Sequence, residues 1–386
     1  MTEKLYYIDS HLFSFGAAVL ECENNAEGKY LTVLDRTAFF PEGGGQKADT
    51  GHISGVRVTH VFEKNGVIYH ECCGYVEPGG DAVCDVDREQ RLRRMQNHSG
   101  EHIVSGLIYR NFGFSNVGFH MGESFMTIDF SGELSDRDLE MIERTANEKV
   151  RENIPVKAFF PSPEELGKTD YRSKLDLREN VRLVSIEGCD ICACCAPHVS
   201  YTGEIGVIKI LSSMRHRGGT RTEVVCGMDA LDNFRVRQSS AEKISALLSA
   251  KQNEISEAVE RVMRTVASQK ERIAALSMRN ASLTADAAAY TEGNICLFND
   301  LLDDVAVREL VNRLTEKCSG IAAVFTRNEE SGYRYIIGSA NTDLRKNAAV
   351  INCGIEGKGG GSPTMIQGSC RADPDKIREF ISGFNK

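Results

Sequence analysis

The sequence has no run of 18 apolar residues, so it offers no candidate transmembrane helix. Its start, MTEKLYYIDSHLFSFG, lacks the basic stretch and apolar core of a signal peptide, and we therefore expect a cytoplasmic protein. Basic residues do not dominate, because 46 Lys and Arg stand against 55 Asp and Glu and the net charge is −9. This balance argues against a general nucleic-acid coat, although a local basic patch still suffices for a nucleic-acid partner.

Cysteine, by contrast, is abundant, at 13 of 386 residues. The number is odd and no export signal accompanies it. We therefore interpret the cysteines as reduced thiols, some of them metal ligands, rather than as a disulfide framework. The length and the apolar content of 41% are typical of a globular protein with two or three domains.

Two short pairs of metal-binding residues lie far apart in the chain. His98 and His102 are four residues apart, and in a helix that spacing places both imidazoles on one face. Cys194 and His198, also four apart, can supply two further ligands. Imidazole and thiolate ligands on two separate segments favour Zn²⁺ over magnesium, calcium or manganese.

Neighbouring residues leave alternatives open at this site. Cys192 and Cys195 are rivals for the place of Cys194. The stretch HSGEH also fits H-x-x-E-H, the pattern of inverted zincin peptidases, in which Glu101 would be the general base. In a protein of another class, we expect Glu101 to be a helix-surface residue or a support for the ligands.

The rest of the chain divides into segments of different pattern, and the predicted class is α+β. Residues 1–88 are rich in strand-type runs between turn residues and predict a small β-barrel or a strongly bent sheet. Residues 89–230 predict an α+β domain with the zinc site. Residues 231–288 carry an apolar heptad pattern and predict a long helix that packs as a coiled coil or a helical hairpin, whereas residues 289–386 predict a compact α/β domain.

Four motifs occur in a fixed order: TAFFPEGGGQ, NHSGEH, GCDICACCAPHVSYTGEIG and RHRGGTRTEVVCG. They resemble the editing domain of alanyl-tRNA synthetases and its free-standing relatives. A fifth motif, GKGGGSPTMIQGS, resembles a loop of the C-terminal domain that follows that editing domain. The whole chain is most similar to the long form of the alanyl-tRNA trans-editing proteins, the AlaX family. Charging of tRNA is not expected, because the catalytic half of a synthetase would need several hundred more residues upstream.

The resemblance implies a zinc ion with four ligands: His98, His102, Cys194 and His198. It also implies that TAFFPEGGGQ lines an aminoacyl pocket, with Thr37 facing the amino-acid side chain and Gln46 nearby as catalytic residues. The chain departs from the family at Cys195, Ala196 and Pro197, where two glycines and a threonine are usual. The proline removes one backbone donor from this loop.

The implied activity is hydrolysis of the ester between a wrong amino acid and alanine tRNA, chiefly serine and in second place glycine. A site that hydrogen-bonds the serine hydroxyl spares alanine, and Thr37 is the residue expected to make that contact. The predicted tRNA contacts are Arg215, Arg217, Arg221 and Lys358, with a further tRNA-facing edge at Arg91, Arg93 and Arg94. We also expect a homodimer through the helical segment or the C-terminal domain. The alternatives are a zinc-stabilised tRNA-binding module without catalysis and an inverted-zincin peptidase.

Overall fold

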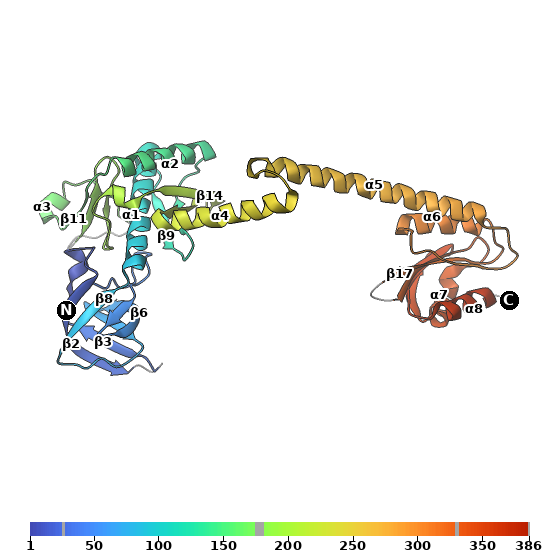
Figure 1. Ribbon diagram of the computed structural model, residues 1–386, viewed down its shortest axis with the longest axis horizontal. Helices are drawn as coiled ribbons and strands as arrows, with labels where there is room; N and C mark the ends of the chain where they lie inside the picture. Colours follow the sequence, from blue (N-terminus) through green and yellow to red (C-terminus); the bar gives the residue numbers. More distant parts are fainter. Residues whose placement is uncertain (25–27, 174–180, 329–331, 385–386) are drawn as a thin grey trace. The chain divides into compact units, whose positions relative to one another are not determined.

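The computed structural model describes residues 1–24, 28–173, 181–328 and 332–384 (Figure 1). Helices and strands are mixed along the chain, which confirms the α+β class. The chain forms two compact units, Met1–Ala241 and Glu242–Lys386, and the boundary between them falls within helix α4 (Gly227–Leu248). Within the described ranges, no helix combines the length and the apolar character that crossing a membrane requires.

The first unit begins with six strands that pair into a closed ring. In ring order they are β2 (Ser14–Asn24), β3 (Tyr30–Leu34), β7 (Val67–Cys72), β6 (Val56–Lys64), β5 (Gly51–Ile53) and β8 (Asp81–Val86). Two short strands, β1 (Glu3–Lys4) and β4 (Arg36–Thr37), pair in parallel beside η1 (Leu5–Tyr7). In β8 the residues Ala82, Cys84 and Val86 are buried and alternate with exposed residues, so one face of the strand fills the core.

Helix α1 (Arg88–Phe112) follows β8 almost directly and fixes the closed ring to the rest of the unit. Arg91 is fully buried, forms an ion pair with Asp49 and donates to the carbonyl of Ser10 at 3.0 Å. Arg93 pairs with Asp229 at 2.7 Å, and Arg94 also lies beside Asp49. The predicted tRNA-facing edge at Arg91, Arg93 and Arg94 is therefore wrong, because these guanidinium groups serve contacts within the unit.

Two sheets complete the first unit. The four-stranded sheet has the order β14 (Ile208–His216), β15 (Gly219–Cys226), β10 (Met126–Phe130) and β9 (Asn116–Met121). The three-stranded sheet contains β11 (Val156–Phe159), β12 (Leu183–Ile186) and β13 (Asp190–Ala193). Helix α2 (Asp136–Arg151) begins at a capping box in which Ser135 accepts from the amide of Asp138. The short helices α3 (Pro163–Leu166) and η2 (Thr202–Ile205) lie in the connections.

The predicted long helix over residues 231–288 is interrupted. Helix α4 ends at Leu248, and after η3 (Gln252–Glu254) helix α5 (Ile255–Ala287) begins. Ser249 has a left-handed φ of 48°, and the amide of Ala250 donates to the carbonyl of Ser245 at 3.0 Å, which is a Schellman-type helix end. Glycine usually takes that position, so the sequence carries no stop signal there.

The apolar heptad residues of α5 are exposed in this chain. Val262, Val266 and Ile273 have exposed fractions of 47%, 40% and 64%. An exposed apolar row is compatible with the predicted coiled-coil contact to a second copy. The homodimer stays a prediction.

The second unit contains a five-stranded sheet in the order β16 (Ile295–Phe298), β17 (Ala322–Asn328), β18 (Gly332–Gly338), β20 (Met365–Cys370) and β19 (Gly357–Gly361). Only β16 and β17 pair in parallel, and the other neighbours are antiparallel. Helices α6 (Asp304–Thr315), α7 (Leu344–Gly354) and α8 (Pro374–Gly383) contribute buried apolar residues to its core. Strand β19 places the glycine-rich motif with Lys358 at a sheet edge.

Candidate metal centre

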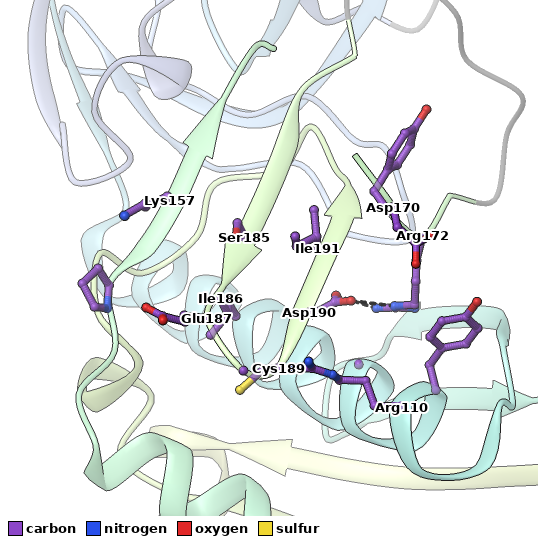
Figure 2. Close-up of a pocket in the computed structure, with 15 residues that line it drawn as sticks. Arg110, Lys157, Asp170, Arg172, Ser185, Ile186, Glu187, Cys189, Asp190 and Ile191 are labelled. Atoms are coloured by element: carbon purple, nitrogen blue, oxygen red, sulfur yellow. Dashed lines mark hydrogen bonds and ion pairs between the residues drawn. The ribbon is translucent and has the colours of Figure 1, made fainter. Parts of the chain in front are cut away.

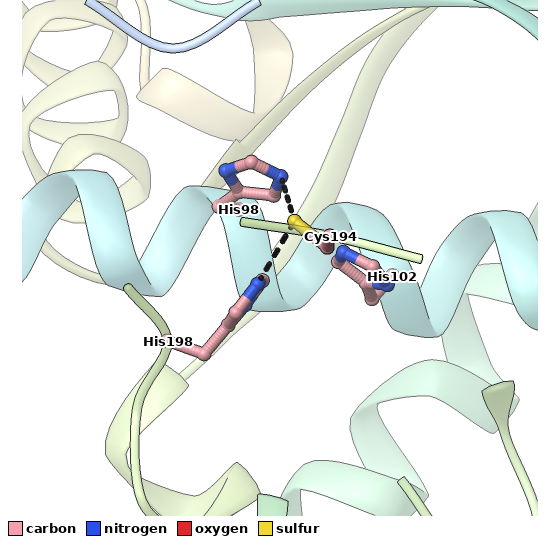
Figure 3. Close-up of side chains that lie close together, drawn as sticks. All are labelled: His98, His102, Cys194 and His198. Atoms are coloured by element: carbon pink, nitrogen blue, oxygen red, sulfur yellow. Dashed lines mark hydrogen bonds between the residues drawn. The ribbon is translucent and has the colours of Figure 1, made fainter. Parts of the chain in front are cut away.

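The two predicted ligand pairs come together in the first unit (Figure 3). The ligand atoms of His98, His102, Cys194 and His198 all lie within 4.8 Å of one another. The Sγ atom of Cys194 lies 3.5 Å from Nε2 of His98 and 3.3 Å from Nε2 of His198. Helix α1 supplies the first pair, and the segment that follows β13 supplies the second. The arrangement suits a borderline-soft divalent ion.

Each of the three histidines uses its Nδ1 atom for a hydrogen bond and leaves Nε2 free to bind a metal. The pairs are His98 with Oε1 of Gln46 at 2.8 Å, His102 with Oδ2 of Asp190 at 2.9 Å, and His198 with Oγ of Ser99 at 3.2 Å. A carboxylate or a carbonyl oxygen only accepts, so Gln46 and Asp190 fix His98 and His102 in the tautomer with the proton on Nδ1, whereas the Ser99 hydroxyl can donate to His198 or accept from it. Metal-binding histidines in proteins are held in the same way.

The electrostatics of the group favour a thiolate at Cys194. Burial alone would raise the pKa of the Cys194 thiol, but His98 and His198 beside it outweigh burial and hold that pKa well below its usual range. Burial lowers the pKa of His198 to about 3, so this imidazole is neutral at pH 7. At His102 the hydrogen bonds to Asp190 and Cys194 outweigh burial and raise the pKa well above its usual range, so zinc would displace a proton from this imidazole on binding. A thiolate and neutral imidazoles are the protonation states that zinc requires of its ligands. The residues present therefore fit the ion that the sequence predicts.

The rival thiols differ in position from Cys194. Cys192 lies within 4.8 Å of His102 and Asp190 in a second group of three, which shares His102 with the first. Among the described residues, Cys195 belongs to no such group. Arg182 donates to the carbonyls of Cys194 and Ala196 at 3.0 and 2.9 Å and so stabilises the loop that carries Cys194 and Cys195.

Two glycines of α1 allow the close approach that assembles the group. A Cβ atom at Gly106 would lie 2.5 Å from the carbonyl oxygen of Cys189 and 2.6 Å from Cβ of Asp190. A Cβ atom at Gly100 would lie 2.3 Å from Sγ of Cys226 in β15. Gly106 therefore lets α1 pack against the start of β13, which brings Asp190 to His102.

Asp190 connects the metal group to a neighbouring pocket of about 460 Å³ (Figure 2). Its carboxylate accepts from Nε and Nη2 of Arg172 at 2.7 and 2.6 Å, in addition to His102. Arg172, Tyr109 and Tyr171 line both this pocket and the one beside the metal group. The sequence analysis missed Asp190 and Arg172. For Asp190, the sequence offered only one indication of a role near the metal group, namely its position four residues before Cys194.

The metal group opens onto a pocket of about 670 Å³. The walls are largely apolar and aromatic and include Tyr7, Phe119 and Phe160, with Arg182 at the side. Pockets of this size bury small organic ligands. Glu101 also lines it and is only 5% exposed, so the expectation that Glu101 lies on the helix surface is wrong.

Neither of the two residues predicted to be catalytic is among the described residues that line this pocket. Thr37 is fully buried, and its hydroxyl bonds to Nε2 of His70 at 2.8 Å and accepts from the amide of Phe39 at 3.1 Å. Gln46 is 1% exposed and holds His98, as described above. Its Nε2 atom is buried and has no hydrogen-bond partner among the described residues. Gln46 is therefore next to the metal group, whereas a substrate would have to displace existing contacts to reach the Thr37 hydroxyl.

The three arginines predicted to bind tRNA all lie on the β14–β15 hairpin but differ in their contacts. Arg215 is exposed on β14 and lies 3.0 Å from the carboxylate of Glu133. Arg217 has a left-handed φ of 49° at the tip of the β14–β15 hairpin, and the two turn residues are Arg217 and Gly218. Arg221 donates to Asp129 at 2.6 and 2.7 Å.

Lys358 belongs to the second unit and lines a pocket of about 590 Å³ there. Arg308 and Arg334 line the same pocket, together with the acidic Asp304. Arg334 pairs with Asp304 at 2.6 Å, and Arg308 donates to Gln367 at 2.6 Å. The glycine-rich motif therefore contributes one cation to a mainly basic hollow.

Comparisons with known proteins agree with this geometry. Residues 181–221 match the family "Threonyl and Alanyl tRNA synthetase second additional domain", and residues 6–90 match "tRNA synthetases class II (A)". The alanine–tRNA ligases of Methanopyrus kandleri and Methanococcus maripaludis are 30% and 29% identical over 98% of this chain. The chain spans only 44% and 43% of the length of these ligases.

A shorter relative matches over nearly its whole length. The alanyl-tRNA editing protein AlaX-L of Pyrococcus horikoshii is 26% identical over 98% of this chain and 96% of its own. The resemblance that the motifs predict is therefore confirmed, since the chain is similar almost from end to end to an alanyl-tRNA editing protein of the AlaX-L type and to the corresponding part of alanine–tRNA ligases.

Proposed function

We propose that this protein is an editing hydrolase that cleaves the ester of mischarged alanine tRNA, chiefly Ser-tRNA(Ala) and in second place Gly-tRNA(Ala). One observation carries the proposal: a four-residue metal group opens onto a 670 Å³ pocket in a chain similar to an alanyl-tRNA editing protein. The pocket is large enough for an aminoacylated nucleoside, not only for a free amino acid. Aminoacylation is not part of the proposal.

The metal group would hold Zn²⁺ through His98, His102, Cys194 and His198. When bound, zinc would act as a Lewis acid that polarises a substrate oxygen or holds the ligand loop in place. Gln46, Asp190 and Ser99 orient the three imidazoles, and Arg182 holds the carbonyls beside Cys194. The chain's own residues thus keep the pocket wall rigid before substrate arrives.

Selectivity for serine requires a polar group that alanine would leave unpaired. The buried Nε2 atom of Gln46 is such a group, because it has no hydrogen-bond partner among the described residues. We therefore propose Gln46, beside the predicted Thr37, as a residue that contacts the seryl group. Thr37 supports this loop through its bond to the Phe39 amide and its bond to His70.

The tRNA would be held by cations away from the reacting ester. Arg215 and Arg217 on the β14–β15 hairpin, and Lys358 in the second unit, would contact phosphates. Arg221 would act mainly through its ion pair with Asp129, which fixes the hairpin against β10. Removal of Arg217 should lower the salt dependence of tRNA binding without changing the zinc content.

The test is a deacylation assay with purified, zinc-loaded protein. Ser-tRNA(Ala) should lose its amino acid whereas Ala-tRNA(Ala) stays intact, and His98→Ala should abolish the activity together with stoichiometric zinc. His60→Ala is the matched control, because His60 lies partly exposed on β6 and far in the chain from every ligand. Intact Ser-tRNA(Ala) after incubation with the zinc-loaded protein would contradict the proposal.

Two alternatives predict different results. A zinc-stabilised tRNA-binding module would bind tRNA tightly without turnover, and the closed four-ligand set is the observation that favours it. An inverted-zincin peptidase would take its third ligand from a glutamate, whereas the group here uses a thiolate and an imidazole. Tight binding without hydrolysis would support the first alternative, and cleavage of peptides would support the second.

A further inference from the structure

Glu101 stands in the wall of the pocket, directly before the ligand His102. Its Oε1 atom accepts from Oγ of Ser105 at 2.5 Å and from Nδ2 of Asn116 at 2.6 Å. Ser105 is fully buried and Asn116 is 8% exposed, so both donors are fixed within the core. One oxygen of the carboxylate is therefore held in a constant position.

The other oxygen of Glu101 is available. Among the described residues, Oε2 has no hydrogen-bond donor, and the nearest charged partner is Nε2 of His102 at 4.0 Å. That nitrogen is the one that Asp190 leaves free for a metal. Of the described residues that line the pocket, Glu101 is the only carboxylate. A buried carboxylate with one oxygen anchored and one unpaired requires an explanation, and proton transfer is one that its position allows.

Several other titratable groups in or beside the pocket are engaged in contacts of their own. His98, His102 and Cys194 form the metal group, and Asp190 behind them is saturated by His102 and two bonds from Arg172. Oε2 of Glu101 is thus a carboxylate oxygen in the described pocket wall that accepts no hydrogen bond.

We propose that Glu101 is the general base of the hydrolysis, and this rests on the proposed editing function. Oε2 accepts a proton from water as the water oxygen bonds to the ester carbonyl carbon. Collapse of the tetrahedral adduct breaks the bond between that carbon and the ribose oxygen. The proton on Oε2 then passes to the ribose oxygen. The products are the free amino acid and tRNA with its hydroxyl restored, and Glu101 is a carboxylate again.

The spacing in the sequence explains why one helix can carry both tasks. In HSGEH, His98 and His102 lie on one face, and Glu101 is three residues after the first and one before the second. The H-x-x-E-H pattern that suggested a peptidase therefore describes the same pairing of a metal group with a base, applied here to an ester. Peptidase ligands are not needed for this arrangement.

The decisive variant is Glu101→Gln. Its amide oxygen can still accept from Ser105 and Asn116, so the variant removes the base and preserves the fold. We expect kcat for Ser-tRNA(Ala) to fall by about 10²–10⁴-fold, with unchanged KM, tRNA affinity and zinc content. Glu89→Gln is the matched control, because it makes the same change on the exposed start of α1 and loses only a pair with Arg93. The control should retain full activity.

A second variant separates a base from a structural role. Glu101→Ala should regain part of its activity with added formate, because a small carboxylate can occupy the space that the side chain leaves. Undiminished kcat in Glu101→Gln, with an active wild-type protein, would overturn the proposal and leave the editing function standing. Loss of zinc in proportion to activity, or no rescue by formate, would also overturn it and make Glu101 a support for His102. An inactive wild-type protein would instead contradict the editing function itself.

Discussion

The carboxylate of Asp190 should set how tightly the metal group binds zinc. It accepts three hydrogen bonds, one from Nδ1 of His102 at 2.9 Å and two from Arg172 at 2.6 and 2.7 Å, and its side chain is 3% exposed. Asp190→Asn keeps the shape but replaces charge-assisted hydrogen bonds by neutral ones. The difference is about 1–2 kcal/mol for the bond to His102. The zinc Kd should therefore rise by about 10-fold, at the lower end of the range for partners of metal-binding histidines.

The assay is a competition titration against a chromophoric chelator at pH 7. Asp129→Asn is the matched control, because Asp129 also receives two bonds from one arginine, Arg221, but contacts none of the proposed ligands. The control should leave the zinc Kd unchanged. An unchanged Kd in Asp190→Asn, or an equal change in both variants, would refute the argument that the Asp190 carboxylate tunes His102.

Three further predictions concern stability. Burial lowers the pKa of His70 to about 4, against about 6.5 in an unfolded chain, so only the unfolded state gains a proton between these values. Stability should therefore fall by up to about 3 kcal/mol as the pH drops from 6.5 to 4, and urea unfolding of His70→Gln should show a smaller fall; equal falls would contradict this. Arg91→Met leaves the buried Asp49 with only the more distant Arg94 as a cationic partner and should lower the free energy of unfolding by up to about 3–5 kcal/mol, so an unchanged urea midpoint would be evidence against the buried pair. Removal of zinc with a chelator should lower Tm, because an ion at 100 times its Kd adds about 2.7 kcal/mol; identical melting curves would show that no metal stabilises the fold.

The grouping of the four candidate ligands could be predicted in part from the sequence, because each pair is local. His98 with His102, and Cys194 with His198, are close in the chain, and helix geometry or a tight loop brings each pair together. The partner of each imidazole could not be predicted in the same way. Asp190 reaches His102 only because the β12–β13 register and the missing side chain of Gly106 place it there.

The burial of the Glu101 side chain also could not be predicted from the sequence pattern. Helix α1 is buried continuously from Asn97 to Ile108, so no polar face marks the solvent side. A charged residue in such a helix looks like a surface residue when only its type is considered. The prediction that Arg91 faces tRNA failed for a related reason. The sequence shows the charge of Arg91 but not that Arg91 pairs with the buried Asp49.

The end of α4 shows a third limit. The heptad pattern continues through Leu248 and Ile255, and residues 249–251 contain neither glycine nor proline. Ser249 nevertheless takes the left-handed conformation that ends the helix. The class of the segment was predictable, whereas its interruption depends on a conformation that serine rarely adopts.

The separation of the ligand pairs along the chain has a consequence for folding kinetics. His98 and Cys194 are 96 residues apart, so the complete ligand set exists only after the chain has closed a long loop. An ion can then be captured late, when most of the first unit has formed, and it stabilises contacts that the folding transition state lacks. Zinc should therefore slow unfolding more than it speeds folding, which stopped-flow measurements with and without the ion would register. A bound ion would therefore stabilise the folded state mainly by lowering its unfolding rate, and removal of the ion would shorten the lifetime of the folded state.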